Sequence, residues 1–314
     1  MREFPRYPLI CAPTPEHRLN RLSDDLGIDL WIKRDDLTGF AMGGNKGRKL
    51  EFLLPQILEA QATTVVTCGS RQSNFIRQLG AACRIAGIKC VALVMDLPYE
   101  PPAAPPKSDV GHEGGNARLG EIFGIEIHHL PNGSWDDLFK AAAEMAQVLR
   151  AAGKAVFEIP VGGSSVPGAY SFWQAAHELR ETYNQIIAAS SSGSTQVGLA
   201  SAFRGSATRV IGIACDPEPE LPHEFAELAH HLDGREWTAA DFEFDLHYVG
   251  PGYGVPSQAG QEALDAMAMR EGILLDPIYS AKAFSALMDL AGQGRLPGRT
   301  LFWHTGGLPA LFTY

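Results

Sequence analysis

The sequence predicts an α/β protein with two domains, each an open, mostly parallel, twisted sheet flanked by helices. Short β-branched runs alternate with helical segments along the chain, small polar residues follow several of these runs, and 314 residues are enough for two domains. Such alternation is typical of parallel sheets with right-handed crossover connections. We expect a smaller domain over residues 50–159, and a larger domain that combines 1–49 with 160–314.

The first half of the chain repeats a strand–loop–helix unit. TTVV at 63–66 is short and β-branched, and the helical segment 74–87 after it ends at a glycine. A strand at 89–95, a helix at 116–124 and a strand at 125–130 continue the pattern. The proline-rich stretch 97–116 cannot be helix interior or central strand. We expect a long loop within one domain rather than an interdomain linker, because strand–helix units continue on both sides.

The second half repeats the same unit. Ser134 and Asp137 have the spacing of a capping box at the start of a helix over 134–153. A strand at 155–160, a helix at 170–183 and a strand at 185–189 follow. A helix beginning near Thr195, a strand at 209–214, a helix around 257–271 and a strand at 300–305 complete the prediction.

Composition excludes several classes of function. A net charge of −10 disfavours a nucleic-acid partner, which needs a basic surface. The N-terminal residues lack the apolar region of a signal peptide, and no apolar run approaches the ~18 residues of a membrane span. Five cysteines without a C-x-x-C motif indicate reduced thiols in a cytoplasmic protein. The ten histidines include no H-E-x-x-H, and we expect no metal site.

Two loops follow predicted strands, where open parallel sheets bind their ligands. SSSGSTQVG at 190–198 precedes a helix, and its amides and helix dipole suit a phosphate, although it matches neither a Walker A loop nor G-x-G-x-x-G. CGSRQSN at 68–74 places Ser73 at a helix N-terminus, where its hydroxyl could face a carboxylate or an oxyanion. On local grounds, each loop is also explained by a simple helix cap.

A third stretch, GGNKGRK at 43–49, holds three cations: Lys46, Arg48 and Lys49. Taken alone, all three are best explained as solvated surface charges. A lysine beside glycines could instead be a Schiff-base nucleophile, which needs close approach and a tuned pKa.

Taken together, these stretches resemble the pyridoxal-phosphate (PLP) enzymes of the tryptophan synthase β type, fold type II. Within them the chain is similar to the branch that contains D-cysteine desulfhydrase and 1-aminocyclopropane-1-carboxylate (ACC) deaminase. The similarity runs almost from end to end, in the family's order. It covers IKRDDLTGFAMGGNKGRKLEFL, CGSRQSN, GGNARLGEIFGIEI, IPVGGSSVPGAY, SGSTQVGL, GYGVPS, DPIYSAKA and HTGGLPALF.

The resemblance implies PLP as the cofactor, with Lys46 as the Schiff-base residue. Arg48 and Lys49 then remain helix-start and surface charges, and we expect Gly43 and Gly44 to let the backbone pass close to the cofactor. The resemblance also implies the remaining site residues. Asn74 would bind the PLP 3-hydroxyl, Gln72 the substrate carboxylate, and the phosphate would be held by Ser192, Gly193, Ser194 and Thr195.

Two tyrosines, Tyr253 and Tyr279, correspond to residues that line the family's pocket. With Lys46 and Ser73, which would lie against cofactor and substrate, Tyr279 completes the expected catalytic set. The residue after it, Ser280, would face the pyridine nitrogen, where ACC deaminases carry a glutamate. A neutral hydroxyl leaves the ring a weaker electron sink, which suits β-elimination and disfavours cyclopropane ring opening.

Two residues depart from the family's pattern. Arg71 precedes Gln72; it either points to solvent or pairs with a carboxylate, or it faces the pocket and binds an anionic substrate tail. Phe75 follows Asn74, at a position where relatives carry a polar side chain. Either a polar group is missing from the pocket here, or Phe75 simply packs in the core.

The resemblance therefore implies a PLP-dependent lyase, similar to D-cysteine desulfhydrase. It would carry out β-elimination on a small amino acid and release a 2-oxo acid, such as pyruvate, and ammonia. An L-cysteate sulfo-lyase that uses Arg71, or an ACC deaminase, is the alternative. A non-catalytic ligand-binding protein on this fold is disfavoured, because Lys46, Ser73, Asn74 and the phosphate loop are all present. The resemblance further implies a homodimer.

Overall fold

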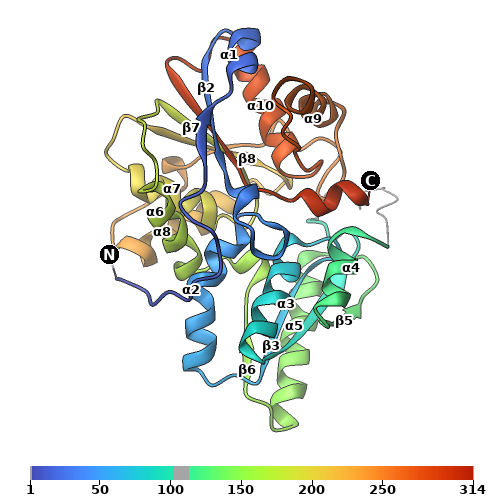
Figure 1. Ribbon diagram of the computed structural model, residues 1–314. Coiled ribbons are helices and arrows are strands. Elements are labelled where there is room, and N and C mark those ends of the chain that lie inside the picture. Colours follow the sequence, from blue (N-terminus) through green and yellow to red (C-terminus); the bar gives the residue numbers. More distant parts are fainter. Residues whose placement is uncertain (1, 102–112, 314) are drawn as a thin grey trace.

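Two mostly parallel sheets organise the protein, and they lie one above the other in Figure 1. The computed structural model describes residues 2–101 and 113–313. The six-stranded sheet has the order β1-β2-β10-β7-β8-β9. Its strands are β1 (Glu16–Arg18), β2 (Asp29–Arg34), β7 (Gln185–Ser190), β8 (Arg209–Ala214), β9 (Glu243–Asp245) and β10 (Arg299–His304). Only the β1–β2 pair is antiparallel within this sheet.

The smaller sheet has four parallel strands in the order β5-β4-β3-β6. These are β3 (Thr64–Ser70), β4 (Lys89–Met95), β5 (Glu126–His129) and β6 (Val156–Glu158). Alternate residues of β4 face opposite layers: Cys90, Ala92 and Val94 pack toward α2 (Lys46–Glu59) and α3 (Asn74–Ala86). Val91 and Leu93 pack toward α5 (Trp135–Ala151). Burial on both faces explains why these strands are almost continuously apolar.

Helices also cover both faces of the larger sheet. One layer contains α1 (Asn20–Leu26), α9 (Gln258–Glu271) and α10 (Ser280–Gly292). The opposite layer contains α6 (Val166–Ala176), α7 (Ser194–Phe203) and α8 (Leu221–Asp233). The short α4 (Gly115–Ile122) packs on α3. Within the described ranges, no helix combines the length and apolar character that a membrane span requires.

Most predicted elements are present, with one clear error. The capping box of Ser134 and Asp137 is confirmed at the start of α5. The predicted helix 170–183 is wrong at its end, because α6 stops at Ala176. The chain then turns to bring Glu178 into a buried ion cluster and Tyr183 against Glu16. The four-stranded sheet falls within residues 50–159, while the domain division itself stays a prediction. The proline-rich loop lies mostly outside the described residues.

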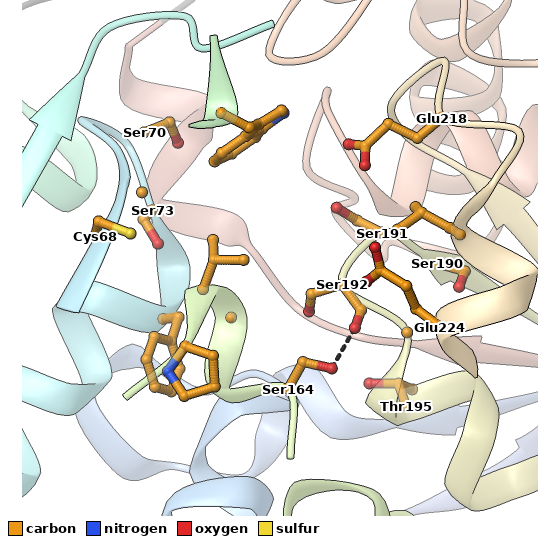
Figure 2. Close-up of a pocket in the computed structure, with 18 of the residues that line it drawn as sticks. Cys68, Ser70, Ser73, Ser164, Ser190, Ser191, Ser192, Thr195, Glu218 and Glu224 are labelled. Atoms are coloured by element: carbon orange, nitrogen blue, oxygen red, sulfur yellow. Dashed lines mark hydrogen bonds between the residues drawn. The ribbon is translucent and has the colours of Figure 1, made fainter. Parts of the chain in front are cut away.

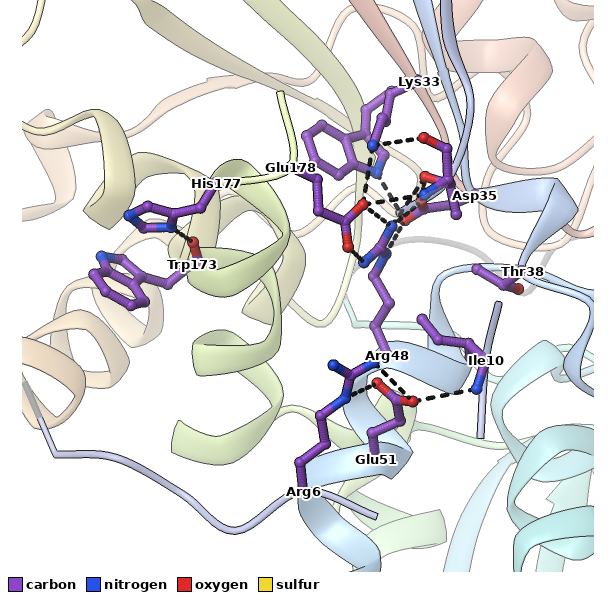
Figure 3. Close-up of polar contacts among 12 residues, drawn as sticks. Arg6, Ile10, Lys33, Asp35, Thr38, Arg48, Glu51, Trp173, His177 and Glu178 are labelled. Atoms are coloured by element: carbon purple, nitrogen blue, oxygen red, sulfur yellow. Dashed lines mark hydrogen bonds and ion pairs between the residues drawn. The ribbon is translucent and has the colours of Figure 1, made fainter. Parts of the chain in front are cut away.

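The prediction that Arg48 and Lys49 are surface charges is wrong. Arg48 is 4% exposed, and its guanidinium makes bidentate contacts of 2.8 Å with Asp35 and of 2.6 and 2.9 Å with Glu178 (Figure 3). Lys33 Nζ lies 2.9 Å from Glu178. Although burial opposes the charged form, these carboxylates raise the pKa of Arg48. The cluster joins β2, α2 and the segment after α6, and so fixes the helix that begins with Lys46.

The glycines of this stretch have a packing role that the sequence does not predict, while their expected approach to the cofactor stays a prediction. Gly43 has φ +71°, and a Cβ there would lie 2.0 Å from the carbonyl oxygen of Asp36. Gly44 has φ +113° and packs against Gln78 and Thr305. These glycines are therefore required by close packing against neighbouring backbone, which holds the entrance to α2 in place.

Candidate active site

A cavity of about 1470 Å³ lies between the two sheets. Its floor is formed by the carboxyl end of β3, by the loop after β7 and by the first residues of α2, α3 and α7. Figure 2 shows Ser70 and Ser73 on one side of the cavity, and Ser190, Ser191 and Ser192 on the other. The cavity therefore lies at strand carboxyl ends, where a ligand is expected.

Lys46 is the first residue of α2 and lines this cavity. Its amine lies 3.5 Å from the position that a Cβ on Gly162 would occupy. Burial lowers the pKa of Lys46 below its ordinary value. A buried amine with a lowered pKa has a larger neutral fraction, which is the nucleophilic and basic form.

Lys49 lies one turn further along α2 and also lines the cavity. It is 1% exposed, and its Nζ donates a hydrogen bond of 3.1 Å to the carbonyl oxygen of Gly162. Burial and the neighbouring Lys46 lower the pKa of Lys49 well below its ordinary value. Holding two neighbouring buried amines in their charged form costs free energy unless an anion lies between or beside them. This part of the cavity is therefore a site for a negatively charged group.

The loop after β7 supplies an anion-binding cradle. Gly193 has φ +88°, and a Cβ there would lie 2.2 Å from the ring of Phe225, so only glycine fits. The helix α7 begins at Ser194, whose hydroxyl is buried and has no partner among the described residues. Asn45 donates a hydrogen bond of 3.1 Å to the Thr195 hydroxyl. The cradle is therefore tied directly to the residue before Lys46.

The turn after β3 presents the N-terminus of α3. Ser73 is the N-cap of this helix, and its hydroxyl accepts a 3.3 Å hydrogen bond from the Ile76 amide. Ser73, Asn74 and Phe75 all line the cavity. Phe75 is 1% exposed and packs in the core, which supports the packing interpretation of that residue. The positive end of the helix thus faces the ligand space.

A chain of hydroxyl groups closes another side. The hydroxyl oxygen of Tyr253 lies 2.8 Å from that of Tyr279 and 3.2 Å from that of Ser70. Burial raises the pKa of Tyr253 to about 12, and it raises the pKa of Tyr279 well above its ordinary value. Both tyrosines therefore stay protonated at neutral pH and can donate a hydrogen bond into the cavity.

Two predicted substrate contacts lie outside the lining of this cavity. The Gln72 side-chain oxygen accepts a 2.8 Å hydrogen bond from the Asn116 amide at the start of α4. Arg71 forms a 3.2 Å ion pair with Asp96 and a 3.3 Å contact with His129. The structure thus places Arg71 in a carboxylate pair, which is one of the two options that its sequence position left open.

Ser280 is buried at the start of α10, and its hydroxyl hydrogen-bonds the Asp276 carboxylate. That carboxylate also accepts hydrogen bonds of 3.0, 2.7 and 2.8 Å from the amides of Ile278, Tyr279 and Ser280. Asp276 therefore caps this helix with both of its oxygens bonded. Ser280 is not among the residues that line the cavity, so its expected contact with the cofactor ring stays a prediction.

These residues fit PLP. Ser192, Gly193 and Thr195 line the cavity at the N-terminus of α7, where only glycine fits at position 193, and together they form a phosphate cradle, whereas Ser194 does not line the cavity. Lys49 supplies a buried amine nearby, which a bound anion would hold in its charged form, and Lys46 supplies the amine for covalent attachment. The described residues contain no cluster of potential metal ligands.

The comparisons with known proteins agree with this arrangement. The family model described as "Pyridoxal-phosphate dependent enzyme" matches residues 8–306, and the chain belongs to this family. The predicted fold, the cofactor and the family resemblance are thereby confirmed.

Individual relatives cover the whole chain. It is 38% identical to a 1-aminocyclopropane-1-carboxylate deaminase of Burkholderia lata and 38% identical to a D-cysteine desulfhydrase of Yersinia enterocolitica. Each alignment covers 100% of this chain and 97% of the relative. A crystal structure of an ACC deaminase homologue has a TM-score of 0.87 at 33% identity, covering 99% of this chain and 94% of that chain.

Sequence reasoning misses several residues of the cavity. Lys49 is expected at the surface, yet its spacing of three from Lys46 places both on one helix face, which is a usable signal. Asn45 and Ser164 give no signal, because their roles depend on the distant loop at Thr195 and Ser192.

Proposed function

We propose that the protein is a PLP-dependent lyase that carries out β-elimination on a small amino acid, in the manner of D-cysteine desulfhydrase. With cysteine as the substrate, one water is consumed and the products are pyruvate, hydrogen sulfide and ammonia. The fold and cofactor of the family support a PLP-dependent lyase; of the two named relatives, one is a D-cysteine desulfhydrase and the other an ACC deaminase.

The observation that carries the choice of β-elimination is the environment of residue 280. By the resemblance, position 280 is where relatives present a group to the ring nitrogen of the cofactor; in this chain its side chain is buried beside Asp276 and does not line the cavity. It is a serine, and the adjacent carboxylate of Asp276 is occupied by three amides and the Ser280 hydroxyl. No free carboxylate is therefore offered at that position to hold a proton on the nitrogen. This favours a reaction in which a good leaving group departs over ring opening of ACC.

The chain's own residues can supply the proton transfers. PLP, when bound, supplies an electron sink for bonds at the substrate Cα. The Lys46 amine, neutral because of its burial, can take the Cα proton. The α3 N-terminus at Ser73 and Asn74 can hold the substrate carboxylate.

The leaving group needs a proton as the Cβ–S bond breaks. The hydroxyls of Tyr253 and Tyr279 are buried, protonated and 2.8 Å apart, and Ser70 extends the chain. We infer that Tyr279 donates this proton, with Tyr253 and Ser70 replacing it. Closure of the cavity by these rings would also limit access of water.

A screen of released 2-oxo acid tests the proposal. Purified holoenzyme is assayed with D- and L-cysteine, β-chloroalanine, D-serine, L-cysteate and ACC. We expect pyruvate from a cysteine enantiomer and from β-chloroalanine. Efficient formation of 2-oxobutyrate from ACC, with little pyruvate from the others, would contradict the argument from Ser280. Family resemblance further supports a cytoplasmic homodimer, which we propose on that ground alone.

A further inference from the structure

One wall of the cavity is acidic. The carboxyl groups of Glu100, Asp136, Glu218 and Glu224 are among the residues that line it. Figure 2 shows Glu218 and Glu224 on the side of Ser191, across the cavity from Ser70 and Ser73. No ion pair to a cation involves Glu100, Glu218 or Glu224 among the described residues, and no arginine lines the cavity there. The amines Lys46 and Lys49 lie at the cofactor end.

A buried carboxylate stands behind this wall. Asp216 follows β8, is 1% exposed, and accepts a 3.0 Å hydrogen bond from the Trp135 indole at one oxygen. Its other oxygen has no partner in the described part of the chain. A buried carboxylate oxygen is costly unless a proton or a cation is supplied; the charge of the buried Lys282 acts on Asp216, and Glu218 is the neighbouring group that can share a proton with it.

The buried Asp216 carboxylate affects the pKa of its neighbour Glu218. Burial and the adjacent Asp216 carboxylate raise the pKa of Glu218 to about 9, and burial also raises the pKa of Asp216. In the ligand-free protein the pair therefore shares a proton at neutral pH. A ligand cation beside Glu218, on the cavity side, would displace that proton and leave both carboxylates charged next to it.

The cavity also has more room than cysteine needs. Its volume of about 1470 Å³ exceeds the ~300–1,000 Å³ of ordinary small-ligand sites. After the cofactor has been accommodated, space remains for a substituent longer than a thiol. The acidic wall determines which end group that substituent would have.

We propose that the substrate's β-substituent ends in a positively charged group, which binds at Glu218, with Asp216 buried behind it and with Glu100 and Glu224 around it. The chemical class is a cysteine thioether with an amine-bearing tail. This inference rests on the proposed β-elimination and names the substrate class for it.

The reaction of such a thioether balances with water alone. The Cα–H bond loses its proton, and the Cβ–S bond breaks with its electron pair going to sulfur, which takes up a proton. One water is then consumed. S-(2-aminoethyl)cysteine would thus give cysteamine, pyruvate and ammonia, with no oxidant or reductant.

A charge series of substrates tests the inference. Both enantiomers of S-(2-aminoethyl)cysteine, S-propylcysteine and S-carboxymethylcysteine differ chiefly in the charge of the tail. For the holoenzyme we expect kcat/KM for the cationic compound to exceed that for the neutral one at least ~10-fold, or ~1.4 kcal/mol. This ratio should fall to near one in Glu218→Gln and in Asp216→Asn. It should stay unchanged in Glu262→Gln, which removes an exposed carboxylate on α9, outside the cavity.

Binding without turnover separates this inference from the proposed function. Lysine and norleucine share the tail geometry but have no β-leaving group, and their dissociation constants can be measured from the absorbance of the bound cofactor. We expect lysine to bind at least ~10-fold more tightly, and Glu218→Gln to abolish the difference.

The outcomes distinguish the two claims. If S-propylcysteine yields pyruvate as well as the aminoethyl compound does, and lysine binds no better than norleucine, the cation site is refuted while β-elimination stands. If none of the thioethers yields pyruvate but lysine binds preferentially through Glu218, the proposed function fails while the cation site stands.

Discussion

Replacing Arg48 by methionine tests the buried ion cluster that holds α2. Methionine keeps much of the apolar stem and removes the guanidinium. That group donates five hydrogen bonds, shared among Asp35, Glu178 and Thr14. The variant would leave Lys33 as the remaining cation beside the buried carboxylate of Asp35 and the partly buried one of Glu178.

The expected loss of stability follows from leaving these carboxylates without their main cation. Removing one partner of a buried ion pair costs ~3–5 kcal/mol. With an unfolding entropy of ~2.1 cal/mol/K per residue, a chain of 314 residues should then lose about 5–8 °C in Tm. Burial alone would raise the pKa of Glu178, but the Arg48 guanidinium holds this pKa below its ordinary 4.5. The stabilisation is therefore present above pH ~4.5 and lost as the pH falls below it, so the deficit should shrink in acid.

Thermal unfolding followed by circular dichroism measures the effect. The matched control is Arg118→Met, because Arg118 forms an exposed pair with Glu121, with side chains 65% and 61% exposed. Such pairs contribute ~0–1 kcal/mol, so Tm should change by less than about 2 °C. Equal Tm values for the two variants at pH 7 would refute the buried cluster.

Three further predictions concern residues around the cavity. Lys49→Met should raise the Tm of the cofactor-free protein at pH 7. The reason is that lysine is protonated below pH ~10.4 in the unfolded chain, whereas burial disfavours the charged form in the folded protein. The same variant should bind PLP ~10-fold or more weakly, as measured by absorbance titration. Arg71→Ala should leave the ratio of kcat/KM for L-cysteate and cysteine within about twofold, since Arg71 pairs with Asp96; a loss confined to cysteate would place Arg71 in the substrate site. Ser280→Ala should cost ~1–2 kcal/mol in urea unfolding, because a hydrogen bond to the Asp276 carboxylate is lost; an unchanged midpoint would contradict that contact.

Local signals make much of the fold predictable. Ser73 and Ser134 cap their helices through bonds spanning three residues, so their positions follow from short motifs. The buried strands are visible as β-branched runs because burial on both faces leaves few polar residues in them. The resemblance, which combines several such motifs in order, then singles out Lys46.

Non-local contacts explain the errors. The local pattern places Arg48 at the surface because its partner Glu178 lies 130 residues away. The same contact ends α6 early, at a place where the local pattern still favours helix. The acidic pair of Asp216 and Glu218 has no motif at all, and only the folded cavity gives it a role.

Attachment of the cofactor to Lys46 is the central claim, and reduction with borohydride tests it most directly. Purified holoenzyme is reduced, digested and mapped by mass spectrometry, with Lys46→Ala as the control. We predict a phosphopyridoxyl group on Lys46 alone and no stable label in the variant. Labelling of another buried lysine, such as Lys49 or Lys282, with Lys46 unmodified, would contradict the account.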